Sequence, residues 1–127
     1  MSDIHWRRYP DFSPGEFACC CGCGTVNVQP ALLSHLQAMR DMLGRPMVVT
    51  SGCRCASHND AVSTATPKSA SPHLGGWAAD IAVRDRAERY AVVDAALAVG
   101  VKRIGVGKSF VHIDVAPHLD EGVLWTY

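Results

Sequence analysis

The sequence has no excess of charge of either sign. Its 12 Lys and Arg residues balance 12 Asp and Glu residues, so the formal net charge at pH 7 is zero. Binding to nucleic acid or to an anionic membrane surface relies on clustered Lys and Arg, and this chain offers no such cluster. We therefore expect no nucleic-acid partner.

Long apolar runs are also missing. No segment approaches the roughly 20 apolar residues that are needed to span a bilayer, and the N-terminus contains no apolar stretch of signal-peptide length. Internal repeats and low-complexity tracts are absent as well. We expect a protein that is made in the cytoplasm, without a signal peptide, and that does not insert into a membrane.

The remaining composition fits a single globular domain over residues 1–127. The chain has 127 residues, of which 48% are hydrophobic, and this length suits one core rather than two domains. Residues 1–26 are rich in Pro, Gly and Cys without a sustained period, which predicts an irregular N-terminal arm. We expect the domain to be a monomer.

Cysteine, in contrast, is plentiful, with six residues in two groups at positions 19–23 and 53–55. Cys20 and Cys23 have the spacing of a zinc knuckle, and Cys53 and Cys55 would complete a second, structural zinc site. A disulfide between the arm and the later pair fits equally well in an oxidising compartment. Either arrangement would tie the arm to the segment that contains Cys53 and Cys55.

Two segments have helical periodicity. Leucine and methionine recur at helical spacing after Pro30, and Gly44 marks the end of this helix. A second helix is capped by Asp85, with Glu88 three residues later, and ends at Gly100. We expect the apolar stripe of the second helix to be formed by Tyr90, Ala91, Leu97 and Ala98.

Four short segments predict β-strands: residues 47–50, 78–83, 103–106 and 110–115. Together with the helices they predict an α+β fold, in which a small antiparallel sheet carries two main helices on one face and a cleft on the other. Residues 53–72 are polar and small and predict a long surface loop, and loops of that length are often functional.

Two of the predicted strands carry polar side chains opposite an aliphatic face. Successive side chains of a strand point to opposite faces of the sheet, which places Asp80 opposite Ile81 and places His112 and Asp114 opposite Ile113. If the two strands are neighbours, the polar groups meet across the sheet. The sequence therefore predicts a shared polar site on the face away from the helices.

His73, Asp80 and His112 fit the ligand set of a hydrolytic zinc site, which uses three protein ligands and leaves one position open to water. Gly75 and Gly76 permit a tight backbone path between His73 and Asp80. Bound zinc makes hydroxide available near neutral pH and polarises the carbonyl group under attack. A histidine on a strand is more often a core or surface group, so the spacing by itself leaves that alternative open.

The motif Ser71-x-His73-x-x-Gly76-x-Ala78-x-Asp80 resembles the signature of the zinc D-alanyl-D-alanine carboxypeptidase family, which also includes peptidoglycan endopeptidases, bacteriophage endolysins and the related hedgehog fold. The similarity extends to Glu16-Phe17 before the first cysteines, to residues 50–55 with His58-Asn59, and to Gly105-Val106-Gly107 leading into residues 110–114. The similarity covers nearly the whole chain, which most resembles the short, single-domain branch found in phages and bacteria.

This resemblance implies that His73, Asp80 and His112 bind one catalytic Zn²⁺ in a metallopeptidase, which cleaves next to a D-amino acid in the stem peptide of bacterial peptidoglycan. Arg54 would lie in the cleft, where its donors suit a substrate carboxylate or carbonyl oxygen and stabilise a developing oxyanion. Ser51 would line the same cleft. Both a carboxypeptidase and an endolysin-type endopeptidase fit, and an endolysin would reach the cell wall through a separate pore.

The general base is the open point of the predicted site. Several family members place a carboxylate three residues before the last zinc-binding histidine, and that position holds Ser109 here. Asp114 is the first candidate because it shares a strand face with His112, although it could instead orient a histidine. His118 is the second candidate, and a register with His118 as the metal ligand is a further alternative. A non-catalytic, zinc-stabilised module that binds cell wall or another protein is the competing interpretation.

Overall fold

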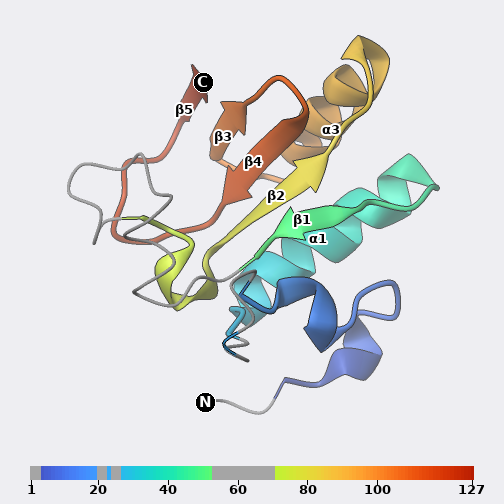
Figure 1. The fold of residues 1–127 in the computed structure, drawn as a ribbon, viewed down its shortest axis with the longest axis vertical. Helices are drawn as coiled ribbons and strands as arrows, with labels where there is room; N and C mark the ends of the chain where they lie inside the picture. The colour runs from blue at the N-terminus through green and yellow to red at the C-terminus, as the bar shows by residue number, and fades with distance from the viewer. Residues whose placement is uncertain (1–3, 20–22, 24–26, 53–70) are drawn as a thin grey trace.

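The computed structural model describes residues 4–19, 23, 27–52 and 71–127. In these ranges the chain forms a five-stranded sheet in the order β1-β2-β4-β3-β5, with two α-helices along one side (Figure 1). The strands are β1 (Val49–Ser51), β2 (Ala78–Ala82), β3 (Arg103–Val106), β4 (Phe110–Asp114) and β5 (Val123–Thr126). The helices are α1 (Pro30–Leu43) and α3 (Arg86–Ala98). The predicted α+β class is confirmed.

Helix α1 begins and ends where the sequence signals predict. Pro30 lies in the first turn, where a backbone N–H would have no helical partner. Gly44 adopts a left-handed φ of 65°, and its N–H donates to the carbonyl of Arg40 at 3.0 Å. The face toward the sheet is fully buried and consists of Leu32, Leu33, Leu36 and Met39.

Helix α3 starts as predicted but buries a different face. The Asp85 carboxylate accepts a hydrogen bond from the backbone N–H of Glu88 at 2.8 Å. Tyr90 and Leu97 are 75% and 59% exposed, so the predicted apolar stripe of Tyr90, Ala91, Leu97 and Ala98 is wrong. The buried residues are Val92, Ala95 and Ala96. Small side chains at these positions let the helix approach its neighbours closely, while Tyr90 and Leu97 face solvent.

The sheet is mixed, whereas the sequence predicts an antiparallel one. The pairs β1–β2, β2–β4 and β4–β3 are antiparallel, but β5 pairs parallel with β3. Strand β5 escaped prediction because its four residues alternate between half-buried and exposed positions at a sheet edge, which leaves a weak hydrophobic pattern. The strand predicted at residues 47–50 is the edge strand Val49–Ser51, with half-buried and exposed positions.

One hydrophobic core fills the space between the sheet and the helices. Ile81 of β2 and Val111 and Ile113 of β4 belong to it, which confirms the predicted aliphatic faces. The arm contributes Phe17, from the single-turn 3₁₀ helix Pro14–Phe17. A Cβ at Gly52 would lie 2.7 Å from the Phe17 Cα, so the arm packs directly on the backbone that follows β1. Among the described helices none is long and apolar enough to cross a membrane.

Candidate metal centre

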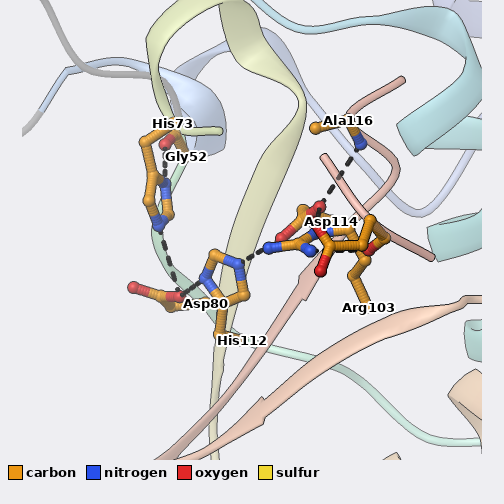
Figure 2. Close-up of polar contacts among 8 residues, drawn as sticks. Gly52, His73, Asp80, Arg103, His112, Asp114 and Ala116 are labelled. Atoms are coloured by element: carbon orange, nitrogen blue, oxygen red, sulfur yellow. Dashed lines mark hydrogen bonds and ion pairs between the residues drawn. The ribbon is translucent and has the colours of Figure 1, made fainter. Parts of the chain in front are cut away.

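His73, Asp80 and His112 meet on the face of the sheet that lies opposite the helices (Figure 2). Asp80 of β2 and His112 of β4 are direct register partners. His73 comes from the turn before β2. One potential ligand atom from each of the three side chains lies within 4.8 Å of the other two. The structure thus brings together the three residues that the sequence predicts as metal ligands.

His73 is held by a hydrogen bond to the backbone that follows β1. Its Nδ1 lies 2.6 Å from the carbonyl oxygen of Gly52. A carbonyl can only accept, so Nδ1 carries the proton and Nε2 keeps its lone pair. That Nε2 lies 3.5 Å from Oδ1 of Asp80.

The turn that carries His73 is built on two glycines and docks on the start of α1. Gly75 and Gly76 have φ angles of 80° and 76°, a region that favours glycine. The Gly76 carbonyl accepts from the Gln29 backbone N–H at 2.9 Å, and the Gly75 carbonyl accepts from Gln29 Nε2 at 2.9 Å. A Cβ at Gly76 would overlap the carbonyl of Asn27. Both the positive φ angle and this close contact therefore require glycine at position 76.

His112 directs Nδ1 toward Asp80, whereas His73 directs Nε2 toward it. Its Nε2 lies 2.7 Å from Oδ2 of Asp114, and its Nδ1 lies 2.9 Å from Oδ1 of Asp80. In the neutral ring the proton on Nε2 leaves the Nδ1 lone pair facing Asp80. Nε2 of His73 and Nδ1 of His112 therefore converge beside one carboxylate. Two neutral imidazoles and a carboxylate are a donor set that suits zinc.

The electrostatics of this cluster favour a cation. Burial by itself would raise the pKa of Asp80, but the adjacent His112 and His73 rings hold that pKa well below its usual range. Burial likewise opposes the charged form of His112, but the neighbouring carboxylates of Asp114 and Asp80 raise the pKa of this ring above its ordinary value. A metal ion competes with this added proton for Nδ1, and the neutral ring is the form that binds the metal. Both histidines are only 3% exposed. Asp80 stays ionised and supplies negative charge in a site that is largely shielded from water.

A comparison with protein families agrees with this chemistry. The family model described as Peptidase M15 matches residues 10–114. The chain belongs to the M15 peptidase family. The predicted resemblance to the zinc D-alanyl-D-alanine carboxypeptidases is thereby confirmed. The matched residues of this M15 chain include His73, Asp80 and His112 and end before β5. No curated protein matched the chain.

Asp114 of this M15 chain lies on the far side of the His112 ring from Asp80. It is fully buried, and its Oδ1 accepts from Nε of Arg103 at 2.8 Å and from the Ala116 N–H at 3.3 Å. Its Oδ2 is occupied by His112 Nε2. Both oxygens are engaged away from the converging donors, an arrangement that fits the alternative in which Asp114 orients a histidine. The role of Asp114 as general base stays a prediction.

The other predicted site residues of the M15 chain have different surroundings. His118 is exposed in the turn region after β4 and lies outside the group of described residues that could hold a metal. Ser51 is half-buried on β1 and is the register partner of Asp80. Arg54 lies outside the described residues, so its predicted role stays a prediction. The same holds for the cysteine pairings, which involve Cys20, Cys53 and Cys55.

Trp125 and Arg103 also lie at this site, although the sequence did not predict them. Asp80, His112, Gly105 and Trp125 are successive partners across β2, β4, β3 and β5. A Cβ at Gly105 would lie 2.6 Å from Trp125 Nε1, so only glycine lets the indole lie over β3, with its ring centre 5.5 Å from that of His112. A glycine inside a strand signals such a close approach, but the partner strand β5 was not predicted.

Proposed function

We propose that this M15 chain is a zinc-dependent peptidase that hydrolyses a peptide bond next to a D-amino acid in the stem peptide of bacterial peptidoglycan. The observation that carries the proposal is the convergence of Nε2 of His73, Nδ1 of His112 and the Asp80 carboxylate in a member of a peptidase family. The motif resemblance supplies the substrate class.

In this mechanism the side chains of the chain hold the metal and keep its ligands in the correct protonation state. His73 and His112 each keep a proton on the nitrogen that faces Gly52 or Asp114, which leaves the other nitrogen free to coordinate. When bound, zinc acts as a Lewis acid on the scissile carbonyl and lowers the pKa of a bound water toward about 7. Arg54 binds a substrate carboxylate or carbonyl oxygen, as the family resemblance implies.

The test combines metal content with product analysis. The purified chain should bind zinc at one equivalent and release D-alanine from a D-Ala-D-Ala peptide or cleave purified peptidoglycan. Mass spectrometry of the peptidoglycan products distinguishes a carboxypeptidase from an endopeptidase. His73→Ala should abolish both zinc binding and turnover, whereas His5→Ala, at an exposed arm histidine, should change neither. Unchanged activity of His73→Ala would contradict the proposal.

A non-catalytic, zinc-stabilised module that binds cell wall is the second candidate. Ser109 occupies the position where several family members carry a carboxylate, and the neighbouring carboxylate of Asp114 is fully engaged. This alternative predicts zinc binding and sedimentation with peptidoglycan, but no turnover of any stem peptide by the zinc-loaded chain. Detectable hydrolysis that chelation removes and zinc restores would exclude it.

We further propose that the protein acts on the cell wall as a monomer, after release through a separate pore. Sedimentation velocity of the zinc-loaded chain should give the mass of a single chain. Added from outside to cells with a permeabilised outer barrier, the wild type should lower turbidity and His73→Ala should not. A dimeric mass, or lysis that the His73→Ala variant reproduces, would contradict this picture.

A further inference from the structure

Asp114 is a buried carboxylate with three hydrogen-bond donors around it. Its side chain is 0% exposed, and Arg103, at 13% exposure, supplies the positive charge in contact with it. The remaining donors are the Ala116 N–H and Nε2 of His112. A buried charge is tolerated only when it is paired and hydrogen-bonded. The position of Asp114 therefore depends on Arg103.

Arg103 is in turn fixed by contacts of its own. It is the register partner of Asp114 across β3 and β4. Its Nη1 donates to the carbonyl oxygen of Asp120 at 2.7 Å, and its guanidinium carbon lies 5.1 Å from the ring centre of Trp125. Stacking of a guanidinium on an indole is favourable. Trp125 also packs against His112, so His112, Asp114, Arg103 and Trp125 form a closed ring of four side chains.

We propose that Arg103 is a positioning residue for the metal centre, which acts on His112 through Asp114 and is braced by Trp125. This inference rests on the proposed zinc function. Nε of Arg103 fixes Oδ1 of Asp114 and thereby the rotation of the carboxylate, which keeps Oδ2 in line with Nε2 of His112. A carboxylate oxygen there holds the ring proton on Nε2 and leaves Nδ1 as the ligand nitrogen. Without Arg103, Asp114 would lose both its charged partner and its orientation.

The first experiment measures zinc affinity by competition with a chromophoric chelator. Arg103→Met should weaken zinc binding by about 10-fold to 100-fold, the usual effect of losing a group that orients a metal ligand. Arg103→Lys should recover part of the loss, because it keeps the charge but not the planar fork. Lys102→Met is the matched control: the neighbouring Lys102 is 65% exposed, pairs with Glu121 at 3.1 Å, and should be silent.

The second experiment reads the His112 ring directly, by nitrogen NMR of the zinc-loaded protein labelled at histidine. In the wild type His112 should coordinate through Nδ1 and show a slowly exchanging Nε2–H, and in Arg103→Met that proton should exchange faster. A merely structural role for Arg103 would move the melting temperature and leave this signal unchanged.

Two results would overturn the inference about Arg103 and leave the proposed zinc function intact. One is coordination of wild-type His112 through Nε2, which can be detected even if Arg103→Met does not fold. The other is wild-type zinc affinity in a folded Arg103→Met protein. A wild type without stoichiometric zinc would instead overturn the proposed function, and this inference with it.

Discussion

Gly76→Ala should destabilise the protein far more than Gly75→Ala, although both glycines have a left-handed φ in the same turn. A left-handed conformation costs a residue with a Cβ about 1–2 kcal/mol, and this term applies to both variants. Among the residues that the structure describes, the new methyl group at Gly75 would meet only the Trp77 side chain, at 3.2 Å. At Gly76 it would overlap the backbone of Asn27 and Val28, including the Val28 Cα at 2.7 Å.

Backbone atoms cannot move aside as a side chain can, so Gly76→Ala adds an overpacking penalty of about 1–3 kcal/mol. We expect a total loss of about 2–5 kcal/mol for Gly76→Ala and about 1–2 kcal/mol for Gly75→Ala. The free energy of unfolding of a small domain is only about 5–15 kcal/mol, so the loss expected for Gly76→Ala is a large part of the total stability. The displaced turn carries His73, and zinc affinity should fall in the same order.

Urea unfolding followed by tryptophan fluorescence measures both losses, since the chain has three tryptophans. The midpoint should shift in each variant while the denaturant slope stays that of the wild type. Gly15→Ala is the control, because Gly15 has an ordinary φ and no atom of the described part of the chain lies within 4 Å of a new Cβ. Equal losses for Gly75→Ala and Gly76→Ala would refute the role assigned to the close contact between Gly76 and the segment before α1.

Three further predictions concern the helices. Leu36→Ala should cost about 2–5 kcal/mol of stability, because Leu36 is fully buried. Leu97→Ala should cost less than about 0.5 kcal/mol, because Leu97 is exposed. A larger loss for Leu97→Ala than for Leu36→Ala in urea unfolding would contradict the burial seen for α3. Asp85→Ala should cost about 1 kcal/mol by removing the cap of α3, with Asp85→Asn close to wild type, and equal midpoints for the two variants would contradict the capping role. The hydrogen bond from Arg84 lowers the pKa of Glu88 to about 2 from its ordinary value of 4.5. The small stabilising effect of this pair is therefore present above pH 4.5 and is lost as the pH falls toward 2. Glu88→Gln should flatten that part of a profile of melting temperature against pH, and an unchanged profile would count against the pair.

The features that could be predicted from the sequence are those that short-range rules determine. The start and end of α1 follow from Pro30 and Gly44, and strand parity places Asp80 and His112 on the face away from the core. These rules need only neighbours along the chain. Strand parity accounts for Asp80 and His112, whereas His73 was predicted from its spacing to Asp80 and from the motif resemblance.

The features that escaped prediction depend on which segments meet in space. Leu97 is as apolar as a core residue, but α3 packs through Ala95 and Ala96, and only the distance to its neighbours decides this. Strand β5 acquires its place through parallel pairing with β3, so the contacts of Trp125 could not be foreseen. The contact between Asp114 and Arg103 likewise depends on the pairing of β3 with β4 and could not be foreseen from the sequence.

The residues that meet at the metal centre are far apart along the chain. Asp80 and His112 are separated by 32 positions, and the intervening chain contains α3 and β3. An ion held by both would therefore act as a removable cross-link that closes a long loop, and an unfolded chain could not present the same donors. Such an ion stabilises the native state by about 2.7 kcal/mol when its free concentration is a hundred times its Kd. The resistance of this protein to proteolysis should then rise and fall with the free zinc of the compartment that it occupies.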